Sequence, residues 1–268
     1  MRHFWLAQLK KDFLWAYSYK VSFYGQFFGI LITVFTFFFI SKTFSLSQSP
    51  HLEAYGNNYF LFVILGISIV DLIGTCMRSA TKSIREAQAF GYIDIVLNAR
   101  VSPQYFVITS MIFPGCVGLI KVFLYMLLAS LFYDFSLSIY TIASMIMLSI
   151  LTVIPFLGIG LLAASFVLAF KQGDPINYLV NISVTLFAGV LFPTTVLPQA
   201  LQYISSLIPA TYSLDVIRKV VIFDSPELIS FQLIFYLLLF SAVFFSLGMF
   251  TIIKTCDSVK LSGTSGRY

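Results

Sequence analysis

The chain has 268 residues, of which 59% are hydrophobic and only 10% are charged, and its formal net charge is +5. An ordinary soluble domain carries about 25% charged residues, so a chain this apolar needs lipid around it, and a large soluble domain is excluded. The basic residues lie between apolar runs, as the topology signals of membrane proteins do, which argues against a nucleic-acid partner.

The N-terminal segment 1–20 mixes lysine and aspartate with apolar side chains. Leu6, Leu9, Phe13 and Tyr17 recur at helical spacing within it. This pattern predicts an interfacial amphipathic helix that lies on the cytoplasmic surface of a membrane. A basic anchor with no mechanical role is the alternative.

Six apolar runs are long enough to cross a membrane, because a span needs about 20 residues. They cover residues 21–41, 58–77, 105–133, 139–170, 175–192 and 229–253. The sequence therefore predicts an all-α integral membrane protein with six transmembrane helices. Residues 1–268 form a single transmembrane domain in this prediction.

The distribution of lysine and arginine predicts the orientation. With the N-terminus inside, the cytoplasmic side receives twelve basic residues: Arg2, Lys10, Lys11, Lys20, Arg78, Lys82, Arg85, Arg100, Lys171, Lys254, Lys260 and Arg267. The other side receives three, Lys42, Arg218 and Lys219. Because basic residues are retained on the cytoplasmic side, both termini are expected to be cytoplasmic.

Two charged residues lie inside the predicted spans. Asp71 is seven residues before Arg78, and Lys121 lies deep in the third span. Charges at membrane depth are costly, so both are candidates for handling a substrate or an ion. Alternatively, Asp71 pairs with Arg78 and Lys121 extends towards the membrane surface.

The stretch 78–103 is the longest polar interval and is predicted to be cytoplasmic. Gly91 can break a helix there. Beyond it, Ile93, Val96 and Leu97 offer an apolar face beside Asp94. The pattern fits a short helix that docks into a groove of a partner, and it equally fits a solvated loop.

The segment 193–222 begins at the end of an apolar run and is interrupted by Pro193, Pro198 and Pro209. Proline removes an amide donor and clashes with the preceding helical turn. Residues 198–208 and 210–222 have room for helices of about 16 and 20 Å, each about half a bilayer or slightly more. The prediction is a re-entrant helical hairpin hinged near Pro209, and a kinked seventh span over 195–217 is the alternative.

Motifs of catalysis and metal binding are absent from the sequence. It contains no GxxxxGK[ST] phosphate loop, no HExxH and no GxSxG, and its three cysteines are far apart. We therefore expect no catalytic residue, no metal site and no cofactor in this chain. An ion-coupled secondary carrier that uses Asp71 and Lys121 remains possible on the residues alone.

Two motifs resemble the membrane subunit of the ABC type-2 exporter family, also called type V ABC exporters. The first is a coupling-helix motif that contains Arg85, Glu86, Gly91, Tyr92, Ile93, Asp94 and Leu97. The second is a proline-rich signature that contains Phe192, Pro193, Pro198, Pro209, Tyr212 and Arg218. The resemblance covers essentially the whole chain.

The resemblance implies a permease without catalytic residues, in a prokaryotic cytoplasmic (inner) membrane. Two such subunits would form a homodimer with two ABC ATPase subunits, which would bind ATP and Mg. The first motif would be the ATPase-coupling site, and the second would be an extracytoplasmic exit gate after the fifth span. A hydrophobic or amphipathic substrate (a lipid, glycolipid, lipid-linked polysaccharide or drug) would pass between the two permease copies within the membrane lipid.

Overall fold

The computed structural model describes residues 2–44, 50–99, 101–133, 138–171, 173–225, 227 and 229–262, so that Arg100 and Arg267 of the topology prediction lie outside it. All regular elements in the described residues are helices. Five of them are long and apolar enough to cross a membrane: α2 (Lys20–Phe44), α3 (Tyr59–Ala89), α5 (Pro103–Ser130), α6 (Ile139–Phe170) and α10 (Phe231–Ser262). The chain is thus an all-α membrane protein with several spans.

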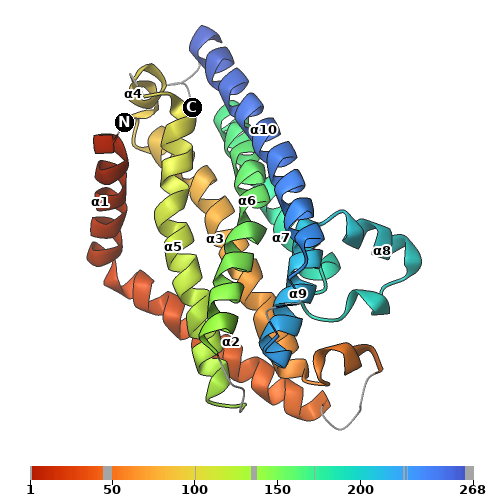
Figure 1. The fold of residues 1–268 in the computed structure, drawn as a ribbon. Coiled ribbons are helices and arrows are strands. Elements are labelled where there is room, and N and C mark those ends of the chain that lie inside the picture. Colours follow the sequence, from red (N-terminus) through yellow and green to blue (C-terminus); the bar gives the residue numbers. More distant parts are fainter. Residues whose placement is uncertain are drawn as a thin grey trace.

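Helix α3 forms the centre of the bundle. It packs against α5 and α6, and α6 packs along α10 on the outside (Figure 1). Of the five long helices, α3 is the most enclosed by protein and α2 the least. Only a few side chains of α3 therefore face away from the protein core.

A contact between two glycines holds α6 against α10. A Cβ atom on Gly158 would lie 2.4 Å from the backbone of Phe244, and one on Gly248 would lie 2.3 Å from the carbonyl oxygen of Gly158. Neither position leaves room for a methyl group. Small residues let membrane helices approach closely, where van der Waals packing replaces the missing hydrophobic effect.

The predicted fifth span is a shorter helix than expected. Helix α7 (Pro175–Phe187) begins at Asp174, whose side chain accepts a hydrogen bond from the backbone amide of Asn177. It ends before Gly189, which adopts a φ of 76°. Its 13 residues make about 20 Å, less than the roughly 30 Å of a hydrocarbon core. The total of six spans stays a prediction.

Two short helices follow, and their boundary lies where the prolines predicted it. After the 3-10 turn η2 (Thr194–Val196) come α8 (Gln199–Ser206) and α9 (Pro209–Phe223), separated by two residues. The hydroxyl of Thr211 donates to the carbonyl of Ser205 at 2.7 Å and fixes the turn between them. The helices therefore break where the prolines lie, while the choice between a re-entrant hairpin and a kinked span over 195–217 stays a prediction.

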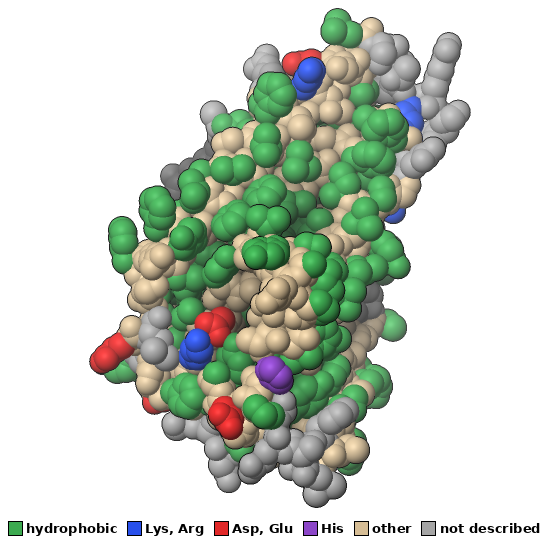
Figure 2. Space-filling model, turned by 90° about the vertical axis from the view of Figure 1, so that its right-hand side faces the viewer, with side chains coloured by type: hydrophobic (Ala, Val, Ile, Leu, Met, Phe, Trp, Pro, Cys, Tyr) green, Lys and Arg blue, Asp and Glu red, His purple; other side chains and the backbone are tan. Residues whose placement is uncertain are grey.

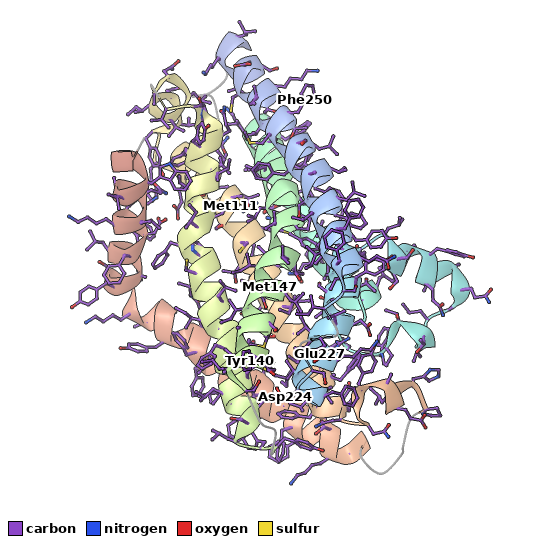
Figure 3. The ribbon with its side chains drawn as sticks, in the orientation of Figure 1. Met111, Tyr140, Met147, Asp224, Glu227 and Phe250 are labelled. Carbon is purple, nitrogen blue, oxygen red and sulfur yellow. The ribbon has the colours of Figure 1, made fainter. Side chains whose placement is uncertain are left out.

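The two ends of the bundle carry different elements. The short helix α4 (Ile93–Asn98) lies at the same end as both ends of the described chain (Figure 1). The other end holds the 3-10 helix η1 (Pro50–Tyr55), Tyr140 at the start of α6, and Asp224 at the end of α9 (Figures 1 and 3). Thr141 donates a hydrogen bond to Asp224 there. This arrangement matches the predicted topology, although the side that each end faces stays a prediction.

The N-terminal segment forms the predicted helix, α1 (Arg2–Ser18), which contacts α5 and runs alongside it (Figure 1). Leu6, Phe13 and Tyr17 are exposed. Lys10 and Lys11 are exposed as well, so the exposed side of α1 is not uniformly apolar, and its amphipathic character stays a prediction. Its placement in the membrane interface stays a prediction.

The face that carries α8 is apolar over most of its area. Hydrophobic side chains cover the broad band across its middle, and charged side chains gather mainly towards the two ends (Figure 2). Such a band is what a lipid-facing surface requires.

Candidate functional site

Helix α3 carries a polar stripe along one side, made of Asp71, Thr75, Arg78 and Lys82. These residues are spaced by four, three and four positions, so they share one face of the helix. They are exposed or half-buried, whereas most other residues of the helix are buried. Charged side chains face lipid only at a high cost, so we expect Asp71, the stripe's residue inside a predicted span, to contact protein or water.

A cavity of about 740 Å³ adjoins the polar stripe, between α1, α2, α3 and α5. Its lining includes four basic and three acidic side chains: Lys11, Asp12, Asp71, Arg78, Lys82, Glu86 and Lys121. The cavity extends from the end of the bundle near α4 to the middle of α3.

The two charges predicted to lie inside spans meet at the inner end of this cavity. The ammonium group of Lys121 is 3.2 Å from one oxygen of Asp71, and the guanidinium of Arg78 is 3.9 Å from the other. Lys121 is only 7% exposed, so it does not extend to the membrane surface. The predicted pairing of Asp71 with Arg78 is present, and Lys121 joins the same carboxylate.

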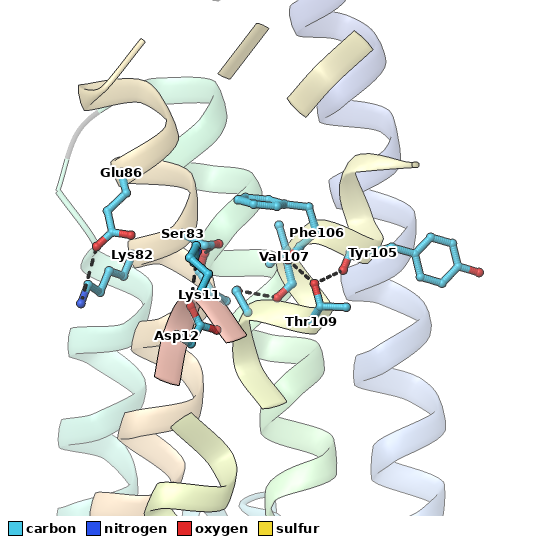
Figure 4. Close-up of polar contacts among 11 residues, drawn as sticks. Lys11, Asp12, Lys82, Ser83, Glu86, Tyr105, Phe106, Val107 and Thr109 are labelled. Atoms are coloured by element: carbon cyan, nitrogen blue, oxygen red, sulfur yellow. Dashed lines mark hydrogen bonds and ion pairs between the residues drawn. The ribbon is translucent and has the colours of Figure 1, made fainter. Parts of the chain in front are cut away.

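The end of the cavity near α4 contains two further ion pairs. Lys11 lies 3.3 Å from Asp12, and Lys82 lies 3.5 Å from Glu86 (Figure 4). Lys82 also lies over the ring of Trp15 at 5.6 Å. Burial raises the pKa of the Asp12 carboxyl above its ordinary value, and the nearby ammonium of Lys11 opposes this rise.

A second cavity of about 810 Å³ lies on the other side of the polar stripe, between α3 and α7. Arg78 and Lys82 line both cavities. The amide of Asn177 in α7 donates to the Met77 carbonyl at 3.3 Å and to the Thr81 hydroxyl at 3.1 Å. This contact fixes the start of α7 beside the stripe.

The predicted coupling region divides at Gly91, whose φ of 73° ends α3 and allows α4 to begin. Ile93 and Leu97 are each 2% exposed and anchor α4 to the chain's own core. Asp94 is exposed, and so is Ile95, at 73%. The outer face of α4 thus differs from the face that the sequence suggested, and Ile95 was missed because a six-residue helix gives too short a pattern.

The remaining residues of the coupling motif lie around the same break. Arg85 is exposed near the end of α3, while Glu86 and Tyr92 are half-buried. Their role in contacting a partner stays a prediction.

Arg218 joins the hairpin to the start of α3. Its guanidinium donates to the carbonyl oxygens of Phe62, at 3.0 Å, and of Val190, at 3.1 Å. It also lies 3.4 Å from the centroid of the Phe62 ring. Arg218 is 2% exposed. Arg218 is thus a buried anchor of α9, and its predicted place in an exit gate stays a prediction.

Sequence reasoning missed the neighbours of this anchor. The Tyr55 hydroxyl donates to Asp215 at 2.7 Å, and Lys219 lies 2.8 Å from the other oxygen of that carboxylate. Burial and the hydrogen bond to Asp215 raise the pKa of Tyr55 above its ordinary value. No local pattern could have paired residues 160 positions apart.

The other gate residues occupy both sides of the turn between α7 and α9. Phe192 is half-buried, Pro193 is buried and Pro198 is exposed directly before α8, while Pro209 is buried at the first turn of α9. The Tyr212 hydroxyl donates to the carbonyl of residue 206 at 2.8 Å. Together they shape a compact hairpin.

Metal-ligating side chains do not cluster in the part of the chain that the structure describes. No group of three or more His, Cys, Asp or Glu side chains lies close enough there to hold an ion.

Comparison with known protein families gives a match over most of the chain. The family model described as ABC-2 type transporter matches residues 7–222, which include the polar stripe of α3, helix α4 and Arg218. A search of curated proteins found no match.

Proposed function

Since the chain belongs to the ABC-2 type transporter family, it is a multi-pass membrane permease of an ABC-type transporter, and we propose that it exports a hydrophobic or amphipathic molecule. Two copies of the chain would face one another across the membrane. The substrate would leave the cytoplasm or the inner leaflet between them.

The polar stripe of α3 carries this proposal. Asp71, Arg78 and Lys82 share one side of a mostly enclosed span. All three line the first cavity, and Arg78 and Lys82 also line the second. A second copy that faces this side would close the stripe off from lipid and leave a polar path at membrane depth. The path would begin near α4 and lead towards the hairpin.

ATP hydrolysis would occur in a separate ABC ATPase subunit, which would bind ATP and Mg. The sequence of the chain contains no GxxxxGK[ST] motif. The exposed Asp94 and Ile95 of α4 and the neighbouring Arg85 would contact the ATPase at the cytoplasmic end. In this arrangement the core packing of Ile93 and Leu97 holds α4 in place.

The hairpin of α8 and α9 would narrow the outer exit of the path. Its two helices measure about 12 and 22 Å, so neither crosses a hydrocarbon core alone. Backbone of this kind persists at membrane depth only when it is buried in protein or lines a cavity. The buried Arg218 would meet that requirement by holding α9 against α3.

An ion-coupled carrier is not favoured. Asp71 is held by two cations, Lys121 and Arg78, and membership of the family connects the chain to an ATP-driven mechanism.

The proposal is tested by purifying the tagged chain from its native membrane and measuring ATP hydrolysis in the complex. We expect an ATPase to co-purify and its activity to require the permease. Asp94→Lys should lower this activity strongly, because it reverses the charge of the exposed face of α4. The yield and the thermal stability of the permease should stay unchanged, because Asp94 is exposed.

Glu53→Lys is the matched control, since it reverses an exposed acid in η1 at the opposite end of the bundle. Equal activity of Asp94→Lys and Glu53→Lys would contradict the coupling role of α4. A purified permease that transports substrate down an ion gradient with no ATPase present would contradict the whole proposal.

A further inference from the structure

We propose that the cavity between α1, α2, α3 and α5 binds the anionic headgroup, a phosphate or a similar oxyanion, of an amphipathic molecule, with Arg78 as the principal contact. This inference rests on the proposed function and specifies the class of substrate that the polar stripe recognises.

The charge balance of the cavity favours an anion. The pairs Lys11–Asp12 and Lys82–Glu86 are each neutral. At the inner end, one carboxylate faces two cations, Lys121 at 3.2 Å and Arg78 at 3.9 Å. One positive charge of the lining is therefore left without a carboxylate partner. An anionic ligand would supply the counter-charge.

The geometry of Arg78 identifies it as the contact. Its side chain is 57% exposed, and its only ion pair among the described residues is the long one to Asp71. By contrast, Lys121 is 7% exposed and already at bonding distance from the same carboxylate. A guanidinium presents five N–H donors in a planar fork that matches two oxygens of a phosphate or carboxylate. Arg78 lines this cavity, although its Nη1 atom lies against Gly74, which lines the second cavity.

The rest of the lining favours an amphiphile over a free anion. Apolar side chains from two helices, Ile30 of α2 and Phe113 and Val117 of α5, line the same cavity as Arg78. Trp15 of α1 lies nearer the α4 end, where it contacts Lys82. A cavity of about 740 Å³ is also much larger than a single phosphate group. The apolar side chains would accommodate the first part of a hydrocarbon chain while Arg78 holds the headgroup.

Trp15 offers a direct measurement of binding. The chain has two tryptophans, so a Trp5→Phe variant leaves Trp15, in the cavity wall, as the single indole reporter. The full-length chain in nanodiscs of neutral phosphatidylcholine would be titrated with dodecyl phosphate. Inorganic phosphate and the neutral amphiphile dodecyl glucoside would be titrated separately. We expect a saturable fluorescence change with dodecyl phosphate at concentrations where the other two give none.

Variants of the cluster test the contact. Arg78→Gln should weaken the binding of dodecyl phosphate by at least about tenfold, because it removes both the charge and the fork. Arg78→Lys should give an intermediate affinity, since it keeps only the charge. Asp71→Asn should strengthen binding, because it leaves two cations without their carboxylate. Lys254→Gln removes an exposed positive charge from α10 outside the cavity and should leave the affinity within about twofold.

Three results would overturn the inference. The first is unchanged binding of dodecyl phosphate to a folded Arg78→Gln variant. The second is equal binding of dodecyl glucoside, which would make the site one for apolar chains alone. The third is equal binding of inorganic phosphate, which would make it a site for a free anion. If Asp71→Asn fails to fold, the two variants of Arg78 still test whether Arg78 contacts the headgroup.

The titration uses the permease without ATP or an ATPase. A negative titration would therefore contradict the headgroup assignment without contradicting the permease function, and an ATPase that fails to couple would leave the binding result intact.

Discussion

Arg218 is a charged residue whose interactions are all made inside the protein. It donates to two backbone carbonyls and lies against the Phe62 ring, and it is 2% exposed. Hydrogen bonds from a charged group contribute about 1.5–3 kcal/mol each, and removing such a donor leaves a buried acceptor unpaired. Its neighbour Lys219 pairs with Asp215 at a partly exposed position, where ion pairs contribute at most about 1 kcal/mol.

We therefore predict that Arg218→Met destabilises the protein by about 3 kcal/mol and Lys219→Met by less than about 1 kcal/mol. Both changes remove one basic residue from the same helix, so Lys219→Met controls for net charge. Thermal unfolding in detergent or nanodiscs measures the difference as a shift of the midpoint. Similar midpoints for the two variants would show that Arg218 does not anchor α9.

At the residue scale, the sequence singled out Asp71, Lys121 and Arg218, but it did not predict all of the residues that they contact. The seven-residue spacing of Asp71 and Arg78 predicted a contact within one helix, and that contact is present. Lys121 could not be assigned to the same carboxylate, because its position depends on how α5 packs against α3. The burial of Arg218 against α3 depends on tertiary packing in the same way.

Among the helices, the contact of α6 with α10 is the most sensitive to a single added atom. A methyl group on Gly158 would meet the backbone of Phe244, which cannot rotate away as a side chain can. Overpacking of this kind costs about 1–3 kcal/mol even where neighbours can adjust.

We predict that Gly158→Ala lowers the midpoint of thermal unfolding by several degrees, since about 1 kcal/mol corresponds to roughly 2–4 °C in a chain of this size. Gly25→Ala is the matched control, because a Cβ atom at that position in α2 meets nothing within 4 Å. The control should be neutral or slightly stabilising, because alanine favours a helix. A neutral Gly158→Ala would mean that α6 and α10 pack less closely than described here.

The ends of helices were predictable where glycine or proline sets them. Gly91 separates α3 from α4, and Pro209 begins α9, as the sequence indicated. The early end of α7 was not predicted, because residues 188–192 are as apolar as those of the helix. Gly189 adopts a left-handed φ there, and its neighbour Val190 places its carbonyl oxygen within reach of Arg218. The end of α7 is thus accompanied by a tertiary contact between Val190 and Arg218, and the composition of residues 188–192 alone does not predict where the helix ends.

For the whole molecule, the two ends of the bundle define a topology that labelling can test. Single cysteines would be placed in a variant that lacks Cys76, Cys116 and Cys256. We predict that Gln199→Cys and Phe223→Cys react with a membrane-impermeant maleimide on intact cells. Lys10→Cys and Leu261→Cys should react only after the membrane is opened.

All four positions are exposed in the structure, so access to the reagent depends on the side of the membrane. Reaction of Phe223→Cys only after opening would place the end of α9 in the cytoplasm. The kinked seventh span would then replace the hairpin, and α10 would cross in the opposite direction.

Helix α3 connects the two regions that the proposed transport cycle has to coordinate. It runs for 31 residues, about 46 Å, and contains no proline, whereas α5 and α6 each contain one in their interior. Arg218 fastens α9 near the first residues of α3, and three residues separate the end of α3 from the start of α4. Spin labels at Asn57 and Phe90 should therefore keep a constant separation while ATP is hydrolysed. Helix α3 would therefore act as a rigid connector. A displacement of α4 on one side of the membrane would be transmitted to the hairpin on the other side, with no hinge between them.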